Sequence, residues 1–136
     1  IDDTVKVTDV LNTLEMLERT FLEDYIPVPG MPALYASLAE SLSDPQFIYI
    51  TGSPFQLFPF LKPFIETAYN ASNGPVYTQN LTILDFEGII EQLTDDDSIY
   101  EYKLTAIDNI HGMYPQKTFL TVGDSTQKDP ETYAEL

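Results

Sequence analysis

The chain has 136 residues, the length of a single domain, and 43% of them are apolar, which is enough to build a hydrophobic core. Six lysines and arginines against 22 aspartates and glutamates give a net charge of −16, which argues against binding nucleic acid through its phosphates and suits divalent cations. The absence of cysteine excludes disulfides, thiolate metal ligands and a cysteine nucleophile.

Helical and strand-like patterns alternate along the chain, and no repeat or interior linker divides it. Apolar residues at helical spacing mark the helices, whereas short runs rich in β-formers mark the strands. In chain order, the patterns predict helix 10–22, helix 32–42, strand 47–50, helix 57–65, strand 76–84, helix 86–93, helix 98–107, strand 117–122 and the start of a helix at 131–136.

Local signals set some of the boundaries and faces of these elements. The apolar stripe predicted for helix 32–42 consists of Leu34, Leu38 and Leu42. Ser98, with Glu101 three residues later, forms a capping box that predicts the start of the helix that follows it. Residues 51–54 are expected to form the turn that ends the first strand, and His111 is expected at the surface near a helix end.

The alternation of strands and helices predicts the α/β class, with a parallel sheet covered by helices on both faces. Ligands of such sheets bind at the carboxyl ends of the strands, and the turns at 1–4, 51–54 and 123–129 all occupy that edge. Two of these turns contain carboxylates, the third contains the hydroxyl of Thr51, and Lys103 lies near the start of a helix. These are the parts of a phosphoryl-transfer site that uses Mg²⁺ and an aspartate nucleophile.

The same segments resemble the motifs of the haloacid dehalogenase (HAD) superfamily. Residues 1–4 match the last four positions of its first motif, Asp-x-Asp-x-Thr/Val. Thr51 matches the second motif and Lys103 the third, and the segment 123–129, Gly-Asp-x-x-x-x-Asp, matches the fourth.

Longer segments resemble a narrower group, the actin-patch-associated family of phosphatidate phosphatases. In order along nearly the whole chain, these segments are 2–8, 27–31, 52–54, 101–104 and 123–130. The last of them is the most specific. Lipins, and the catalytically silent lipin-like domains of some phosphatidylinositol transfer proteins, are similar at a greater distance.

The resemblance implies a three-layer HAD-like (Rossmannoid) parallel sheet in one catalytic domain over residues 1–136, truncated at both ends. It also implies that the nucleophilic aspartate directly precedes Ile1, and that the strand leading to that aspartate, the first of the sheet, is missing. The fragment by itself is therefore expected to be inactive. A boundary artefact explains the missing strand better than a naturally dead protein, because the other motif residues are intact.

The family mechanism assigns a role to each matched residue. Asp2 is expected to protonate the leaving oxygen and then to deprotonate the attacking water. Thr51 is expected to donate a hydrogen bond to the phosphoryl oxygens, with Ser53 as the rival for this role. Lys103 is expected to offset the charge of those oxygens.

The resemblance also implies a Mg²⁺ site. The absent aspartate, the backbone carbonyl of Asp2 and the carboxylate of Asp124 are expected to hold the ion, with Asp129 acting through water or through Lys103. Simpler interpretations stay open, because Asp3 is expected to be a structural turn residue and Asp129 suits the cap of a helix.

The function implied is Mg²⁺-dependent hydrolysis of phosphatidate to diacylglycerol and phosphate through an aspartyl-phosphate. Two alternatives stay open: an HAD phosphatase of a soluble phosphate ester, and a non-catalytic lipid-binding module. The partners implied are phosphatidate in a membrane surface and, through regions outside the fragment, actin-patch or endocytic proteins, but no nucleic acid. The location implied is the cytoplasm, peripheral to membranes or at cortical actin patches. The phenylalanines expected in the core rather than against acyl chains are Phe55, Phe58, Phe60 and Phe64.

Overall fold

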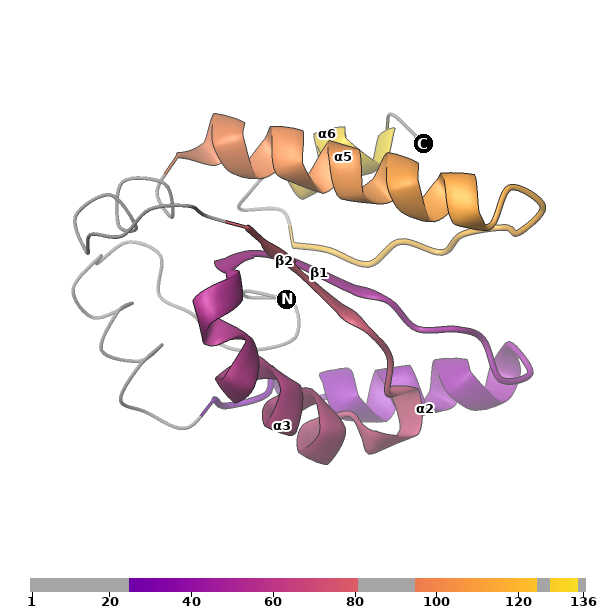
Figure 1. Cartoon of the computed structure of the whole chain (residues 1–136). Coiled ribbons are helices and arrows are strands. Elements are labelled where there is room, and N and C mark those ends of the chain that lie inside the picture. Colours follow the sequence, from indigo (N-terminus) through magenta and orange to yellow (C-terminus); the bar gives the residue numbers. More distant parts are fainter. Residues whose placement is uncertain (1–24, 81–94, 125–127, 135–136) are drawn as a thin grey trace.

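The computed structural model of the chain describes residues 25–80, 95–124 and 128–134 (Figure 1). Asp2 and Asp3 of the first motif lie outside these residues, as do the helices predicted over 10–22 and 86–93. The fold described below is therefore that of the two central parts of the chain and of a short C-terminal segment.

Two parallel strands lie at the centre of the described residues. Strand β1 covers Tyr49–Pro54 and strand β2 covers Val76–Gln79. Tyr49 pairs with Val76, and the register shifts once in the second half of β1. β1 thus begins two residues later than the predicted strand and includes residues 51–54, so the turn predicted there is wrong. These four residues are buried and extended because they continue the pairing with β2.

Helices lie on both sides of the strands (Figure 1). The helices and short 3₁₀ turns are α2 (Met31–Ser41), η1 (Phe55–Leu57), α3 (Phe58–Ala68), η2 (Asn70–Ser72), α5 (Asp96–Met113) and α6 (Asp129–Ala134). Figure 1 shows α2 and α3 on one side and α5 with α6 on the other. The predicted α/β class and the predicted parallel pairing are confirmed. Among the helices of the described ranges, none combines the length and the apolar character needed to span a membrane.

The main hydrophobic core lies between β1, α2 and α3. Its buried residues are Tyr35, Tyr49, Leu57, Leu61, Phe64, Ile65 and Tyr69. The rings of Tyr35 and Tyr69 meet edge to face, with centroids 5.4 Å apart. The hydroxyl of Tyr49 donates to the backbone oxygen of Ser72 at 3.0 Å, so a polar atom inside this core is hydrogen-bonded.

The apolar faces of α2 and α3 differ in how well their sequences predict them. In α3, the apolar positions Leu61, Phe64 and Ile65 are buried as predicted. In α2, the stripe prediction is confirmed for Leu38, which packs against the core, but it is wrong for Leu34 and Leu42, which are exposed while Tyr35 is buried. The large tyrosine ring fills the space beside the other core tyrosines, which turns that side of α2 toward the core.

The phenylalanines that follow β1 divide between the core and the surface. Phe64 is buried and Phe58 is half-buried, as expected of core residues. Phe55 and Phe60 are exposed, so the core prediction is wrong for these two. Phe55 lies in η1, before α3 begins, and Phe60 is not among the buried positions of α3, which are Leu61, Phe64 and Ile65.

Helix α5 begins three residues before the predicted capping box. The side chain of Asp95 accepts a hydrogen bond from the backbone nitrogen of Asp97 at 3.3 Å and caps the helix. Ser98 therefore lies inside α5, and its hydroxyl accepts a hydrogen bond from the side-chain nitrogen of Gln79 at 3.3 Å. The capping-box prediction is wrong because an earlier carboxylate takes the cap. His111 is exposed in the last turn, as predicted.

The strand predicted over 117–122 is wrong. This segment runs beside α5 in Figure 1, but it has no regular secondary structure and its residues are exposed. β1 and β2 form the whole sheet of the described residues, and neither is hydrogen-bonded to this segment as a neighbouring strand. A β-forming sequence favours an extended backbone, but a strand forms only where a partner satisfies its peptide groups.

Candidate active site

The hydroxyl groups of Thr51 and Ser53 belong to β1, Thr51 as its third residue and Ser53 as its fifth. Both residues are buried, and the backbone nitrogen of Ser53 donates to Oγ1 of Thr51 at 3.0 Å. This bond uses one acceptor site of the threonine oxygen and fixes its orientation, while the hydroxyl proton is a donor in its own right. The structure thus places both predicted hydroxyls on β1, with Ser53 directly before its last residue.

A buried ion pair joins α5 to α6. Nζ of Lys103, on α5, donates to Oδ1 of Asp129, the first residue of α6. The two side chains are only 8% and 5% exposed. Because both side chains are largely shielded from water, each charge is stabilised by the other, and either charge buried alone would be energetically costly. Two residues predicted from separate motifs therefore meet, and of the two routes predicted for Asp129 this contact favours the one through Lys103.

The segment before α6 comes very close to this pair. A Cβ atom on Gly123 would lie 2.5 Å from Oδ2 of Asp129 and 2.7 Å from Cε2 of Tyr133. Only a residue without a side chain fits this approach. Asp124 follows directly, half-buried, with its Oδ2 atom fully buried. Asp124 therefore continues the backbone that touches Asp129, and its charge, like that of Asp129, acts on Tyr133.

Tyr133 also belongs to the site, although the sequence motifs give no hint of it. Its hydroxyl donates to the backbone oxygen of Val122 at 3.3 Å. Burial raises the pKa of Tyr133, and the charges of Asp129 and Asp124 raise it further. The phenol is therefore neutral at physiological pH and holds the backbone that leads into Gly123. The available signal was its position four residues after Asp129, on the same side of a helix.

A second lysine, which directly precedes α6, forms an ion pair with α5 at the surface. Lys128 pairs with Asp97 in the first turn of α5, and its ammonium lies 5.7 Å from the ring centroid of Tyr100. The hydrogen bond from Lys128 lowers the pKa of Asp97. Both charged groups are exposed, so this pair adds little stability.

The two halves of the site are linked through α5. A Cβ atom on Gly52 would lie 2.9 Å from Cγ2 of Ile99, so β1 and α5 are in close contact there. Ile99 and Lys103 are four residues apart on the buried side of α5. The carboxyl end of β1 therefore lies one helical turn from the ion pair. Asp2, the remaining predicted site residue, lies outside the described residues.

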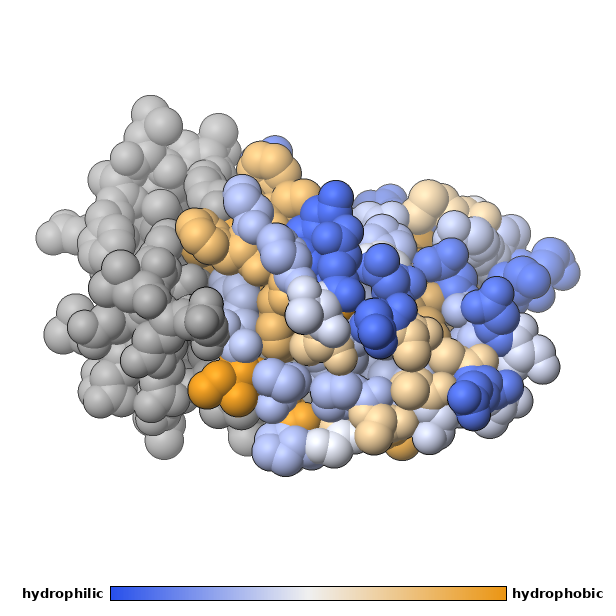
Figure 2. All heavy atoms as spheres, turned by 90° about the horizontal axis from the view of Figure 1, so that it is seen from below, coloured by the Kyte–Doolittle hydropathy of each residue, from blue (hydrophilic) through white to orange (hydrophobic). Residues whose placement is uncertain are grey.

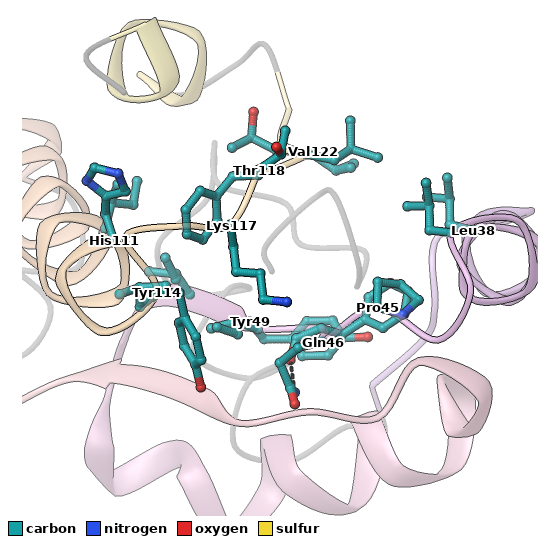
Figure 3. Close-up of a pocket in the computed structure, with 18 of the residues that line it drawn as sticks. Leu38, Pro45, Gln46, Tyr49, His111, Tyr114, Lys117, Thr118 and Val122 are labelled. Carbon is teal, nitrogen blue, oxygen red and sulfur yellow. Dashed lines mark hydrogen bonds between the residues drawn. The ribbon is translucent and has the colours of Figure 1, made fainter.

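A cavity of about 590 Å³ lies elsewhere, between β1 and the segment 117–122 (Figure 3). Residues from four parts of the chain line it, including Leu38, Tyr49, His111, Tyr114 and Lys117. None of the predicted site residues within the described ranges borders it. The cavity lies where the segment 117–122 runs beside β1 without pairing to it, and it borders the candidate site at Val122 and Tyr133.

A parallel sheet with a buried lysine–carboxylate pair near its strand ends suits phosphoryl transfer. All 136 residues match the family described as "Phosphatidate phosphatase APP1, catalytic domain", and the chain belongs to this family. It is 32% identical over 136 residues to the Phosphatidate phosphatase APP1 of Saccharomyces cerevisiae. That match covers 98% of the chain but 22% of the yeast protein. No solved structure shows a significant match.

Proposed function

We propose that the chain is the catalytic part of a phosphatidate phosphatase, which hydrolyses phosphatidate to diacylglycerol and phosphate. The observation that carries this proposal is the buried Lys103–Asp129 pair beside Asp124, formed by residues of two phosphatase motifs. Membership of the APP1 catalytic-domain family supports the choice of substrate, as does the name of the yeast relative.

In the proposed reaction, Lys103 and Thr51 bind the phosphoryl group. Asp129 holds Nζ of Lys103 in place, so the ammonium is oriented before the substrate arrives. The backbone nitrogen of Ser53 donates to the oxygen of Thr51 and orients the side chain that is proposed to donate to the phosphoryl group. Charge-assisted donors placed in advance are the main means of stabilising a loose phosphoryl transition state.

The covalent steps are assigned to aspartates of the first motif. In a complete three-layer HAD-like sheet, the nucleophile is the aspartate expected directly before Ile1. A carboxylate oxygen of this aspartate bonds to phosphorus while the bond between phosphorus and the glycerol oxygen of the lipid breaks. Asp2 donates a proton to the glycerol oxygen. Asp2 then takes a proton from the water that cleaves the aspartyl-phosphate and releases phosphate.

The donor chemistry of the site fits Mg²⁺. Asp124 offers a carboxylate with one buried oxygen, and carboxylate oxygens are the ligands that this ion prefers. Among the described residues, no three acidic or histidine side chains are placed to hold a metal. The further ligands proposed are the aspartate expected before Ile1 and the backbone carbonyl of Asp2. Asp124 and Asp129 together outweigh Lys103 by one negative charge. A bound Mg²⁺ would offset that excess and the charge of the phosphate.

Phosphate release by the full-length protein tests the proposal. The substrates are phosphatidate in detergent micelles and a water-soluble phosphomonoester, each with Mg²⁺ and with excess EDTA. We expect release from phosphatidate that needs Mg²⁺. Turnover of the soluble ester alone would favour the soluble-ester phosphatase, and binding of lipid without turnover would favour the non-catalytic module.

Two lysine variants provide the matched control. Lys103→Met should abolish phosphate release, since it removes the charge proposed to bind the phosphoryl group. Lys62→Met should leave release unchanged, because Lys62 forms an exposed pair with Glu66 on α3. Equal activity of both variants would remove Lys103 from the proposed mechanism.

A further inference from the structure

Charge is distributed unevenly along the chain, and one long stretch is neutral. Between Asp44 and Asp85 the sequence contains one acidic residue, Glu66, and one basic residue, Lys62. These two side chains lie 3.8 Å apart, one turn from each other on α3. Their charges cancel, so the rest of the chain carries the whole net charge of −16.

Apolar side chains are exposed within this neutral stretch. Phe55 is 60% exposed and Phe60 is 52% exposed. The ring of Phe55 stacks on that of the half-buried Phe58, with centroids 6.1 Å apart. We call this group, together with two exposed prolines of α3, the phenylalanine face; its members are Phe55, Phe58, Pro59, Phe60 and Pro63.

The core does not account for the exposed members of this face. The side of α3 that packs against the rest of the protein consists of Leu61, Phe64 and Ile65. Figure 2 shows orange and tan spheres bordering the grey residues at left, while the deep-blue spheres gather in the centre and at right. In this view the most strongly orange spheres of the described residues therefore lie toward the grey residues, apart from most of the deep-blue ones.

The phenylalanine face lies next to the candidate site. Phe55 directly follows Pro54, the last residue of β1, and Thr51 and Ser53 lie within the preceding four positions. In Figure 1 the beginnings of α3 and α5 lie at the same end of the strands. A surface that touched this face would therefore come close to the hydroxyls and to the first turns of α5.

We propose that the phenylalanine face inserts into the surface of a lipid bilayer that contains phosphatidate and holds the site against the lipid headgroups. This inference rests on the proposed function, since a lipid substrate has to be reached at a bilayer surface. An acidic protein is repelled by anionic lipids, so its attachment needs apolar insertion rather than charge. The members of the phenylalanine face are uncharged and the charges of Lys62 and Glu66 beside them cancel, so insertion at this face meets less repulsion than contact through the acidic first turn of α5 would.

Vesicle flotation of the full-length protein tests the inference, with phosphatidylcholine vesicles that contain phosphatidate. The test variant is Phe55→Ser/Phe60→Ser. The control variant is Leu42→Ser/Met113→Ser, whose side chains are 50% and 54% exposed near the opposite ends of the strands. We expect the test variant to lose about tenfold or more in vesicle binding, because two aromatic side chains no longer leave water. The control should bind like the wild type.

Hydrolysis of phosphatidate in vesicles should fall together with binding in the test variant. Hydrolysis of a short-chain phosphatidate that is dissolved in water should stay unchanged, since neither phenylalanine acts in the proposed chemistry. Vesicle binding equal to the wild type would overturn the inference. A change from dimer to monomer with unchanged vesicle binding would also overturn it, and would make the face an interface between copies.

A second measurement uses a variant in which the phenylalanine face stays aromatic. Phe60→Trp should show a blue shift of its tryptophan emission when vesicles are added, and Leu42→Trp should not. Equal shifts at both positions, or none at Phe60→Trp, would contradict insertion at this face. A wild-type protein that binds vesicles through the face but hydrolyses no phosphatidate would refute the proposed function and support the docking surface.

Discussion

Lys103 and Asp129 are each necessary to the other, because both are buried and oppositely charged. Lys103→Met should leave the carboxylate of Asp129 without its cation and cost about 3–5 kcal/mol of the free energy of unfolding. Adding Asp129→Leu to this variant should restore much of that stability without restoring phosphatase activity. Denaturant unfolding and phosphate release of both variants measure the two effects. A double variant that is less stable than Lys103→Met would contradict this account.

Gly123 and Gly112 form a matched pair of glycines. Gly123→Ala should destabilise the protein by about 1–3 kcal/mol, because the added methyl group would collide with Asp129 and Tyr133. Gly112→Ala meets nothing within 4 Å and lies inside α5, so it should stabilise the protein by about 0.5–1 kcal/mol. Opposite shifts in thermal unfolding are the expected result, and equal losses would mean that close approach at Gly123 is unimportant.

The motif residues show what sequence can predict of a site. Thr51, Lys103 and Asp129 could be placed near strand ends because their spacing matched a known pattern. The partnership of Lys103 with Asp129 was one of two routes expected, and only the packing of α5 against α6 distinguishes them. Tyr133 escaped prediction because a tyrosine in a short acidic helix has no motif, and its role depends on the backbone of Val122.

The start of α5 gives a test at the level of one element. Asp95→Ala should cost about 1 kcal/mol of stability, because the cap to the backbone nitrogen of Asp97 is lost. Asp95→Asn should stay close to the wild type, since asparagine caps equally well. Thermal unfolding of the two variants checks this. If both lost the same stability, the negative charge rather than the cap would be what matters at this position.

Most elements with a strong periodic pattern were predictable, whereas their first and last residues were not and their buried faces were predictable only in part. α3 and its buried side followed from the spacing of Leu61, Phe64 and Ile65. The cap of α5 had several candidates in a row, and the sequence does not tell which carboxylate or hydroxyl meets the first backbone nitrogens. Residues 117–122 have strand-like composition, but whether a partner strand lies beside them is a property of the whole fold.

Buried tyrosines make the whole molecule sensitive to alkali. Burial raises the pKa of Tyr49, and it is the main cause that raises the pKa of Tyr69 and of Tyr102 to about 12. A raised pKa means that the folded state holds the proton more tightly than the unfolded state does. Stability from these groups is therefore complete below about pH 10 and is lost as the pH rises toward 12. We expect tyrosinate absorbance and loss of circular dichroism to rise together, and ionisation without unfolding would contradict this.

The ion pair between α5 and α6 has a consequence for the motions of the protein. It joins residues 26 positions apart, so α6 cannot open without uncovering a charge on each side. A six-residue helix alone would fray readily, yet this one should open only together with α5, as one cooperative unit. Hydrogen exchange should therefore give the amides of Thr132 and Tyr133 protection like that of the middle of α5. In Lys103→Met that shared protection should disappear first from α6.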